Sequence, residues 1–181
     1  TTRALPERGR IGVFNRSYYE EVLVVRVHPE YLGGQKLPYE VPLEEVWQQR
    51  YESIRGHEHH LAHSGVVVLK FWLNVSQEEQ HRRFLDRIDK PEKNWKFSGG
   101  DVKESRLWDQ YMEAYEEALC ETSRAHAPWY AIPADDKPFM RTCVADIVER
   151  TLAQLPLAYP QPSEEELAKM KEFRAELSKG E

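Results

Sequence analysis

The chain has 181 residues and a formal net charge of −6, and 31% of its residues are charged while 40% are apolar. This length allows one domain with a full hydrophobic core, and the acidic balance argues against nucleic acid as a partner. No apolar run approaches the roughly 20 residues of a membrane span, no signal peptide is recognisable, and the two cysteines suggest no disulfide framework. We therefore expect a cytoplasmic protein that does not bind membranes.

The first distinctive stretch is a short apolar run, Ile11–Phe14, that leads into the polar turn of residues 15–17. The run is too short for a helix and predicts a buried strand. Ser17 can cap a following helix, which we expect to end near His28 because the next residue is proline. Such a strand delivers Arg16 to the edge of the sheet where open α/β folds bind ligands. A surface turn with an exposed arginine is the alternative.

Two long elements follow in the middle of the chain. A helix is predicted from Leu43 to about His63, and Gly65 closes it. The run over 65–76 is almost continuously apolar, which predicts a strand buried on both faces within a parallel sheet. Ser76 and Glu79 have the spacing of a capping box, so the next helix begins at once; we expect it to end near residue 87.

The second half continues the alternation of strands and helices. We expect a lysine-rich loop over 89–100, a helix from Asp101 to about Thr122, a strand over 128–133 and a helix over 139–155. Three prolines then mark a linker, and Ser163 with Glu166 caps an amphipathic terminal helix. The order predicts an α/β three-layer sandwich with a parallel sheet over residues 1–155, followed by a linker and helix over 156–181.

Basic residues gather in the segment after the central strand. Arg83 and Arg87 are four residues apart on one helix face, and a lid that closes over phosphates would use such a pair because guanidinium groups bind phosphate oxygens bidentately. Acidic residues interleave with them, so a solvated charged face is the alternative. The other basic members are Arg82, Lys90, Lys93 and Lys96, and the acidic ones are Asp86, Asp89 and Glu92.

Two further clusters have both a functional and a structural interpretation. His59 and His63 have the spacing of two zinc ligands, but position 61 is leucine, which breaks the HExxH motif, and the helix end favours charged histidines for its own reasons. We therefore favour a structural role for the histidines. Asp135 and Asp136 follow the third predicted strand and either touch a nucleotide or cap a helix.

Several segments together resemble the polyphosphate kinase 2 family. The segment 11–28 is similar to its Walker-B-like segment, and 70–80 with Arg83 and Arg87 is similar to its central strand and lid helix. Residues 91 and 95–98 resemble its lid loop, and 108–111, 127–129 and 133–137 follow in the family's order. The resemblance covers about residues 3–155 and is specific because the motifs occur together.

This resemblance implies a P-loop kinase-like fold, similar to thymidylate kinase, with a helical lid. It implies a polyphosphate kinase that moves phosphoryl groups between inorganic polyphosphate and AMP or ADP, with Mg²⁺ as cofactor. Adenine nucleotides are the expected partners, with guanine nucleotides as a second option. Phosphoryl transfer depends on positioning and charge neutralisation, which arginine, lysine and metal supply.

The resemblance also implies roles for individual residues. Arg16 would hold phosphate beside the metal, and Arg83 and Arg87 would close over the phosphates with Lys96. The expected catalytic residues are Asn15, Arg16, Arg83 and Arg87. The expected substrate-binding residues are Glu20, Arg26, Trp95 and Lys96. No side chain is assigned as a direct metal ligand.

The chain departs from the family pattern at two places. Many members have Asp where this chain has Asn15, and an amide lacks the charge that favours Mg²⁺. Asn15 with Glu20 resembles the branch that accepts AMP as well as ADP. The phosphate loop of the family lies upstream of Thr1 and has no counterpart in these residues, so the chain resembles the carboxyl-terminal two-thirds of such an enzyme. We expect these residues alone to be inactive.

Two other functions stay open. One is an ATP-dependent nucleoside monophosphate kinase of the same fold, and the other is a non-catalytic module that binds polyphosphate or nucleotides. The amphipathic terminal helix leads us to expect a homo-oligomer.

Overall fold

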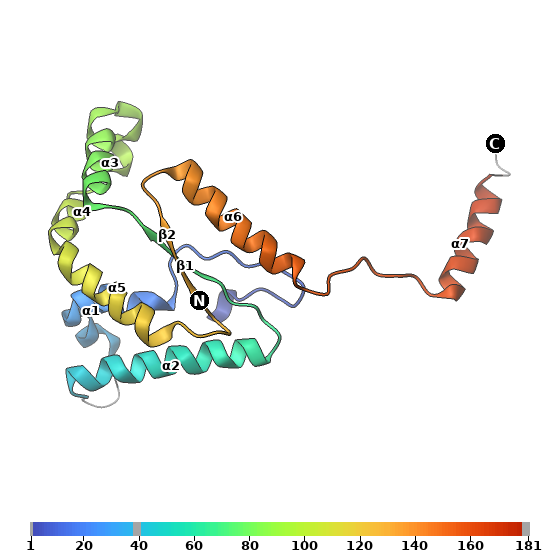
Figure 1. Cartoon of the computed structure of the whole chain (residues 1–181), viewed down its shortest axis with the longest axis horizontal. Coiled ribbons are helices and arrows are strands. Elements are labelled where there is room, and N and C mark those ends of the chain that lie inside the picture. Colours follow the sequence, from blue (N-terminus) through green and yellow to red (C-terminus); the bar gives the residue numbers. More distant parts are fainter. Residues whose placement is uncertain (1, 38–40, 179–181) are drawn as a thin grey trace. The chain divides into compact units, whose positions relative to one another are not determined.

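The parallel sheet is the centre of the fold. A computed structural model describes residues 2–37 and 41–178. In this part of the chain, β1 (Lys70–Asn74) pairs with β2 (Trp129–Pro133) in parallel, and the register runs from Lys70 opposite Trp129 to Asn74 opposite Pro133 (Figure 1). The helices between the strands form the crossover that a parallel pair requires. The expected α/β architecture with a parallel sheet is therefore confirmed.

Helices and 3₁₀ turns make up most of the remaining structure. The 3₁₀ turns are η1 (Thr2–Ala4), η2 (Tyr18–Glu21), η3 (Pro29–Gln35), η4 (Pro91–Lys96) and η5 (Ser105–Leu107). The α-helices are α1 (Val24–Val27), α2 (Leu43–His63), α3 (Gln77–Asp89), α4 (Gly99–Glu104), α5 (Trp108–Thr122), α6 (Lys137–Ala153) and α7 (Glu164–Leu177). None of the helices in the described ranges is long and apolar enough to cross a membrane.

The chain forms two compact units, Thr1–Arg141 and Thr142–Glu181. The core of the first unit lies where α2 and α5 run side by side and η2 and α1 pack against them (Figure 1). Trp47 and Tyr51 on α2 are buried, and Ala114 and Ala118 on α5 leave room for the bulky side chains of the neighbouring helix. This core supports the segment that contains Arg16 and Glu20.

The predicted strand at Ile11–Phe14 is wrong. Within the described residues no strand pairs with this segment, and Ile11 and Val13 are 71% and 92% exposed. An apolar run becomes a strand only when another backbone accepts its hydrogen bonds, so composition alone misassigned it. The turn behind it is unusual, because Arg16 has a φ of 71° in the left-handed region that few non-glycine residues adopt.

The predicted helix after Ser17 begins as expected and then breaks. The Ser17 side chain accepts a hydrogen bond from the Tyr19 backbone N–H at 3.3 Å and caps η2. Val22 then leaves the helical region, with φ −119° and ψ 2°, and a short α1 ends at Val27. Four valines between positions 22 and 27 lower the helix propensity of this stretch, which explains the break.

Two other boundaries differ from the predictions. The central strand covers 70–74 rather than 65–76, and it is not buried on both faces, because Leu73 is 45% exposed and Val67 before it is 51% exposed. β2 is its only strand neighbour in the described residues, so one of its edges has no strand partner there. The helix predicted from Asp101 begins instead at Gly99, capped by Ser98, and is divided into α4, η5 and α5.

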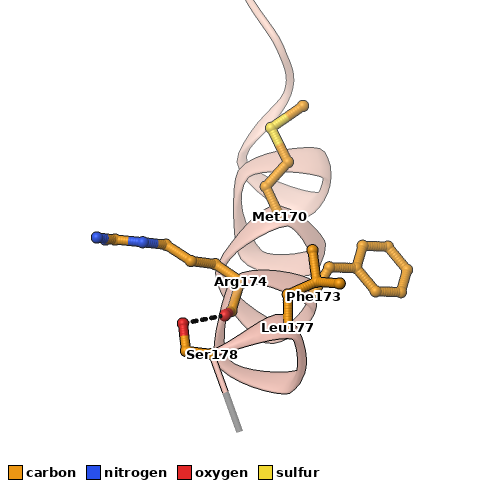
Figure 2. A pocket seen from close by; sticks show the side chains of 5 residues that line it. All are labelled: Met170, Phe173, Arg174, Leu177 and Ser178. Carbon is orange, nitrogen blue, oxygen red and sulfur yellow. Dashed lines mark hydrogen bonds between the residues drawn. The ribbon is translucent and has the colours of Figure 1, made fainter. Parts of the chain in front are cut away.

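The remaining elements match their predictions closely. α2 covers 43–63, with Gly65 beyond it at a φ of 81°. At the start of α7, Ser163 and Glu166 form the predicted capping box, in which each side chain accepts from the backbone N–H of the other. Met170, Phe173 and Leu177 project from this helix, while Arg174 points to another side (Figure 2).

Candidate functional site

Arg16 and Glu20 lie together at the start of η2. The Arg16 guanidinium is 3.7 Å from the Glu20 carboxylate, and the Arg16 side chain is 79% exposed. Asn15 beside them is exposed as well. The left-handed backbone at Arg16 turns this group away from the extended segment before it. The structure therefore places three of the predicted site residues next to one another on an accessible turn.

The turn is anchored by a buried polar network. The Glu58 carboxylate, fully buried on α2, accepts hydrogen bonds from the hydroxyls of Tyr18 and Tyr19 at 2.9 and 2.8 Å. Lys70, at the start of β1, donates to the other Glu58 oxygen at 2.7 Å and to the Tyr19 hydroxyl at 2.9 Å. A third bond from Lys70 reaches the backbone oxygen of Thr122 at the end of α5, at 2.9 Å.

This network is not predictable from sequence patterns, although the sequence contains one signal of it. Lys70 interrupts an otherwise apolar run over 66–73, and a lysine in a buried strand needs an acceptor. Glu58 gives no comparable signal, because it stands between His57 and His59 in a polar stretch. Burial within the network changes the acidity of two of its members. It raises the pKa of Tyr19 well above its ordinary value and lowers the pKa of Lys70.

Arg26 and the surroundings of Glu20 form a second group around α5. Arg26 on α1 pairs with Glu117 at 2.9 Å, and its guanidinium lies 4.9 Å from the centre of the Trp47 ring. Burial is the main cause that raises the pKa of Tyr115, and the charge of Glu20 adds to it. The charge of Glu20 thus acts on Tyr115 of α5, whereas Arg26 is paired with Glu117 of the same helix.

Arg83 connects α3 to the residues that directly follow β2. Its guanidinium donates to the Glu79 carboxylate at 2.6 Å and to the backbone oxygens of Ala134 and Asp135 at 2.8 and 3.0 Å. Ser76 caps α3 by accepting from the Glu79 N–H, as predicted, but its own N–H donates to the Asp135 side chain at 2.7 Å. Asp135 thus contacts the backbone at the start of α3 rather than the first turn of the helix that follows it in sequence.

Asp136 caps the helix that follows it, α6. Its side chain accepts from the backbone N–H of Phe139, in the first turn of α6, at 2.7 Å. Consecutive aspartates at the end of β2 thus serve two different helices, and their hydrogen-bond partners are on the protein backbone.

Most of the basic cluster on α3 and η4 is neutralised. Five of its six cations pair with carboxylates of described residues: Arg82 and Arg83 with Glu79, Arg87 with Asp101, and Lys90 and Lys93 with Asp86. The Lys96 ammonium lies 4.8 Å from the centre of the Trp95 ring, and Trp95 is 78% exposed. The alternative of a compensated charged face therefore describes much of the cluster.

The predicted site residues occur as separate groups. Asn15, Arg16 and Glu20 share the turn before η2, and Arg83 and Arg87 share α3. Arg26 pairs on α5, and Trp95 with Lys96 lies in η4. Among the described residues, no hydrogen bond or ion pair joins Asn15, Arg16 or Glu20 to α3 or η4.

The histidines of α2 lie near one another without a ligand set for a metal. The rings of His59 and His63 are 4.1 Å apart and that of His126 is 5.3 Å from His59. Among residues 2–37 and 41–178, no group of three or more His, Cys, Asp or Glu side chains is placed to hold a metal ion. Asn15 and Glu20 offer one amide oxygen and one carboxylate, which are too few ligands for an Mg²⁺ site built by the protein alone.

The chain is similar to known proteins over most of its length. It is 50% identical over 180 residues to ADP-polyphosphate phosphotransferase of Rhodopseudomonas palustris, which covers 99% of this chain and 62% of that protein. It is 47% identical over 158 residues to AMP/ADP-polyphosphate phosphotransferase of Meiothermus ruber, covering 87% of this chain and 55% of that protein. The chain therefore spans less than two-thirds of the length of these relatives.

The fold has a matching solved structure as well. The crystal structure of Polyphosphate Kinase 2 from Arthrobacter aurescens TC1 superposes with a TM-score of 0.82 and 36% identity, over 94% of this chain and 58% of that one. This match confirms the expected fold class. The family model described as Polyphosphate kinase 2 matches residues 1–159. The chain belongs to the polyphosphate kinase 2 family.

Proposed function

We propose that this chain is part of a polyphosphate-dependent nucleotide phosphotransferase that moves phosphoryl groups between inorganic polyphosphate and AMP or ADP. The observation that carries the proposal is family membership over residues 1–159, together with relatives named as phosphotransferases that act with ADP or with AMP and ADP. Adenine and guanine nucleotides are both included in the proposed substrate range.

The proposed roles follow from the chemistry of phosphoryl transfer. The reaction needs in-line positioning and donors for the phosphate oxygens rather than a covalent intermediate. Arg16 is exposed on a turn fixed by the core, which suits a phosphate contact. Arg87 and Asp101 form a partly exposed pair at 3.2 Å, and a phosphate oxygen could replace this carboxylate as the acceptor. Arg83 would act from a fixed position, because three of its hydrogen bonds go to the protein.

Several finer properties belong to the same proposal. Mg²⁺ as cofactor, a homo-oligomeric state and a cytoplasmic location are part of it. Mg²⁺ is commonly held by substrate phosphates with only one or two carboxylates of the protein, which is compatible with the small oxygen donor set near Asn15. The choice of AMP as an acceptor rests on the pair Asn15 and Glu20.

The test compares this 181-residue chain with the longest form that its gene encodes. Each protein is incubated with polyphosphate, Mg²⁺ and AMP or ADP, without ATP, and the nucleotides are separated by chromatography. We expect ADP and ATP to form with the longest form. Product from ADP alone would overturn the AMP assignment but keep the reaction class.

The same assay separates the two other functions. A requirement for ATP as the phosphoryl donor, with no use of polyphosphate, would identify a nucleoside monophosphate kinase. Bound polyphosphate without any product from the longest form would identify a binding module and refute the proposed transfer.

A further inference from the structure

We infer that Glu58 and Lys70 are positioning residues for Arg16 and Glu20. The buried network that these two residues form with Tyr18 and Tyr19 fixes the start of η2, and with it the turn that presents the exposed charges. The inference rests on the proposed function for its consequence in catalysis, but the positioning itself is a property of this chain.

The hydrogen bonds of the network allow only one arrangement of the Lys70 ammonium, the Tyr19 hydroxyl and the Glu58 carboxylate. A lysine has three N–H donors, and those of Lys70 reach Glu58, the Tyr19 hydroxyl and the backbone oxygen of Thr122. The Tyr19 hydroxyl accepts from Lys70 and donates to Glu58, so both of its roles are used. Glu58 receives Tyr18 on the same oxygen. Fully satisfied buried networks specify a geometry because any other rotamer leaves a polar atom unpaired.

The network also joins elements that are distant in sequence. It connects η2 with α2, with the first residue of β1 and with the last turn of α5. Thr122 extends it further, because its hydroxyl accepts a hydrogen bond from the Trp129 indole N–H on β2 at 2.9 Å. Hydrogen bonds therefore connect the start of η2 to both strands of the sheet.

A short path leads from the anchored tyrosines to the exposed charges. The Tyr19 N–H donates to the Ser17 side chain at 3.3 Å, and the Glu20 N–H donates to the Ser17 backbone oxygen at 3.2 Å. Arg16 is the next residue toward the N-terminus and Glu20 the next after Tyr19. Arg16 is thus one peptide bond from Ser17, and Glu20 is one peptide bond from Tyr19. Fixing the tyrosine hydroxyls therefore also fixes the backbone from which both charged side chains project.

The segment before the turn gives little support of its own. Ile11 and Val13 are 71% and 92% exposed, and the Arg16 side chain is itself mostly in solvent. Stability is also a weak reason to bury the pair Glu58 and Lys70, because apolar residues of the same volume often stabilise a core as well. An apolar pair would not hold two hydroxyls at fixed points, which the network does.

The test removes one hydroxyl from the network in the longest form of the protein. Tyr19→Phe keeps the ring between Tyr18 and Trp129, whose ring centres lie 5.2 and 4.7 Å from it, and deletes only the oxygen. Tyr130→Phe is the matched control. It also deletes a tyrosine hydroxyl, but Tyr130 follows Trp129 on β2 and its ring stacks on Phe71, outside the network. Amide hydrogen exchange of residues 17–23, thermal unfolding and steady-state kinetics are measured for each.

We expect the Tyr19→Phe amides at residues 19–23 to exchange about tenfold faster or more, and kcat to fall about tenfold while the nucleotide KM changes less than about threefold. The control should change neither quantity by more than about twofold. A lower melting temperature with exchange and kcat per folded enzyme equal to those of the control would show a merely structural role and overturn the inference.

Failure of the proposed function gives a different result. If the unmodified protein transfers nothing from polyphosphate, the proposed reaction is refuted, and the exchange rates alone decide the positioning. Faster exchange confined to residues 17–23 in Tyr19→Phe upholds it, and rates equal to those of the control overturn it.

Discussion

At the scale of single residues, the most informative feature is the buried ion pair of Glu58 and Lys70, in which each charged group has hydrogen-bonding partners. The Glu58 side chain has no exposed surface and that of Lys70 is 6% exposed, yet the two lie 2.7 Å apart with hydroxyl and backbone partners around them. Removing one member of such a pair leaves the other charge without compensation. The pair should therefore behave as a unit under mutation.

Lys70→Met should destabilise the protein by about 3–5 kcal/mol, because it leaves the Glu58 carboxylate buried and unpaired. Glu58→Leu should have an effect of similar size, and the double variant should lose clearly less than the sum of the two. Urea unfolding of the four proteins measures this coupling. Strictly additive losses would contradict a paired role for the two residues.

His28 provides a pH-dependent contact. Its ring nitrogens lie 2.9 Å from Glu104 and 3.1 Å from Glu30, and the hydrogen bond to Glu104 is the main cause that raises the pKa of His28 above its ordinary value of 6.5. A raised pKa means that the folded state holds the proton more tightly. Its stabilisation is complete below pH 6.5 and is lost as the pH rises through the raised pKa.

Glu104→Gln should bring the pKa of His28 back toward 6.5 and flatten the pH dependence of stability above that pH. NMR titration of the His28 ring checks the pKa, and melting temperatures between pH 6 and 9 check the linkage. Glu172→Gln, on α7, is the control. An unchanged His28 titration in Glu104→Gln would refute the assignment of the cause.

At the scale of elements, the segment α3 to η4 combines a fixed base with a charged tip. Arg83 and the cap from Asp135 hold the first turns of α3 to the end of β2. Farther along, Arg87 pairs with Asp101, and Lys90 and Lys93 hold Asp86. These two parts lead to separate predictions.

Arg87→Ala should lower kcat/KM for phosphoryl transfer by about 10²-fold, the usual effect of removing one donor to transition-state charge. Arg82→Ala is the matched control on the same helix, because Arg82 is 66% exposed and pairs only with Glu79 among the residues for which contacts are described. Steady-state kinetics of the longest form of the protein compare the two. Equal losses would assign the effect to the general charge of α3 rather than to Arg87.

The tip should loosen in acid. Hydrogen bonds from Lys90 and then Lys93 lower the pKa of Asp86 to about 2, from an ordinary value of 3.8. A lowered pKa contributes stability above pH 3.8 that is lost as the pH falls toward 2. The NMR signal of the Trp95 indole in η4 should shift over this range, and Asp86→Asn should remove the shift. A shift that persists in the variant would assign it to another carboxylate.

The elements that were predictable share a local cause. α2 and α7 follow from apolar spacing and their terminal residues, and β2 from its bounded apolar run. Ile11–Phe14 was not predictable, because strand formation depends on a partner that is distant in sequence. The same holds for the site: Arg16 and Glu20 are only four residues apart in sequence, whereas the contact from Glu58 to Tyr19 spans 39 residues.

At the scale of the whole molecule, the exposed apolar surface is notable. Ile11, Val13, Val67 and Leu73 are each at least 45% exposed. Scattered apolar residues are normal on a surface, but Ile11 and Val13 form one extended stretch without a strand partner in the described residues. Such a stretch favours association between chains.

The 181-residue chain should therefore self-associate as its concentration rises. Replacing both residues, Ile11→Ser and Val13→Ser, should reduce the association more than Leu157→Ser, which removes a comparably exposed residue, 68%, from the linker. Sedimentation velocity at two concentrations measures the effect. An equal reduction by the linker variant would show that the extended stretch is not responsible.

The attachment of α3 to β2 has a mechanical consequence. Ser76 is hydrogen-bonded to Asp135, and Arg83 to the backbone oxygens of Ala134 and Asp135, so the first turns of the helix cannot swing without breaking these hydrogen bonds. If this segment closes over a ligand, its hinge is expected on the C-terminal side of Arg83. Arg87, Trp95 and Lys96 would then move together, while Arg83 would stay in place beside β2. The two arginines of one helix face would therefore contact a phosphate chain one after the other.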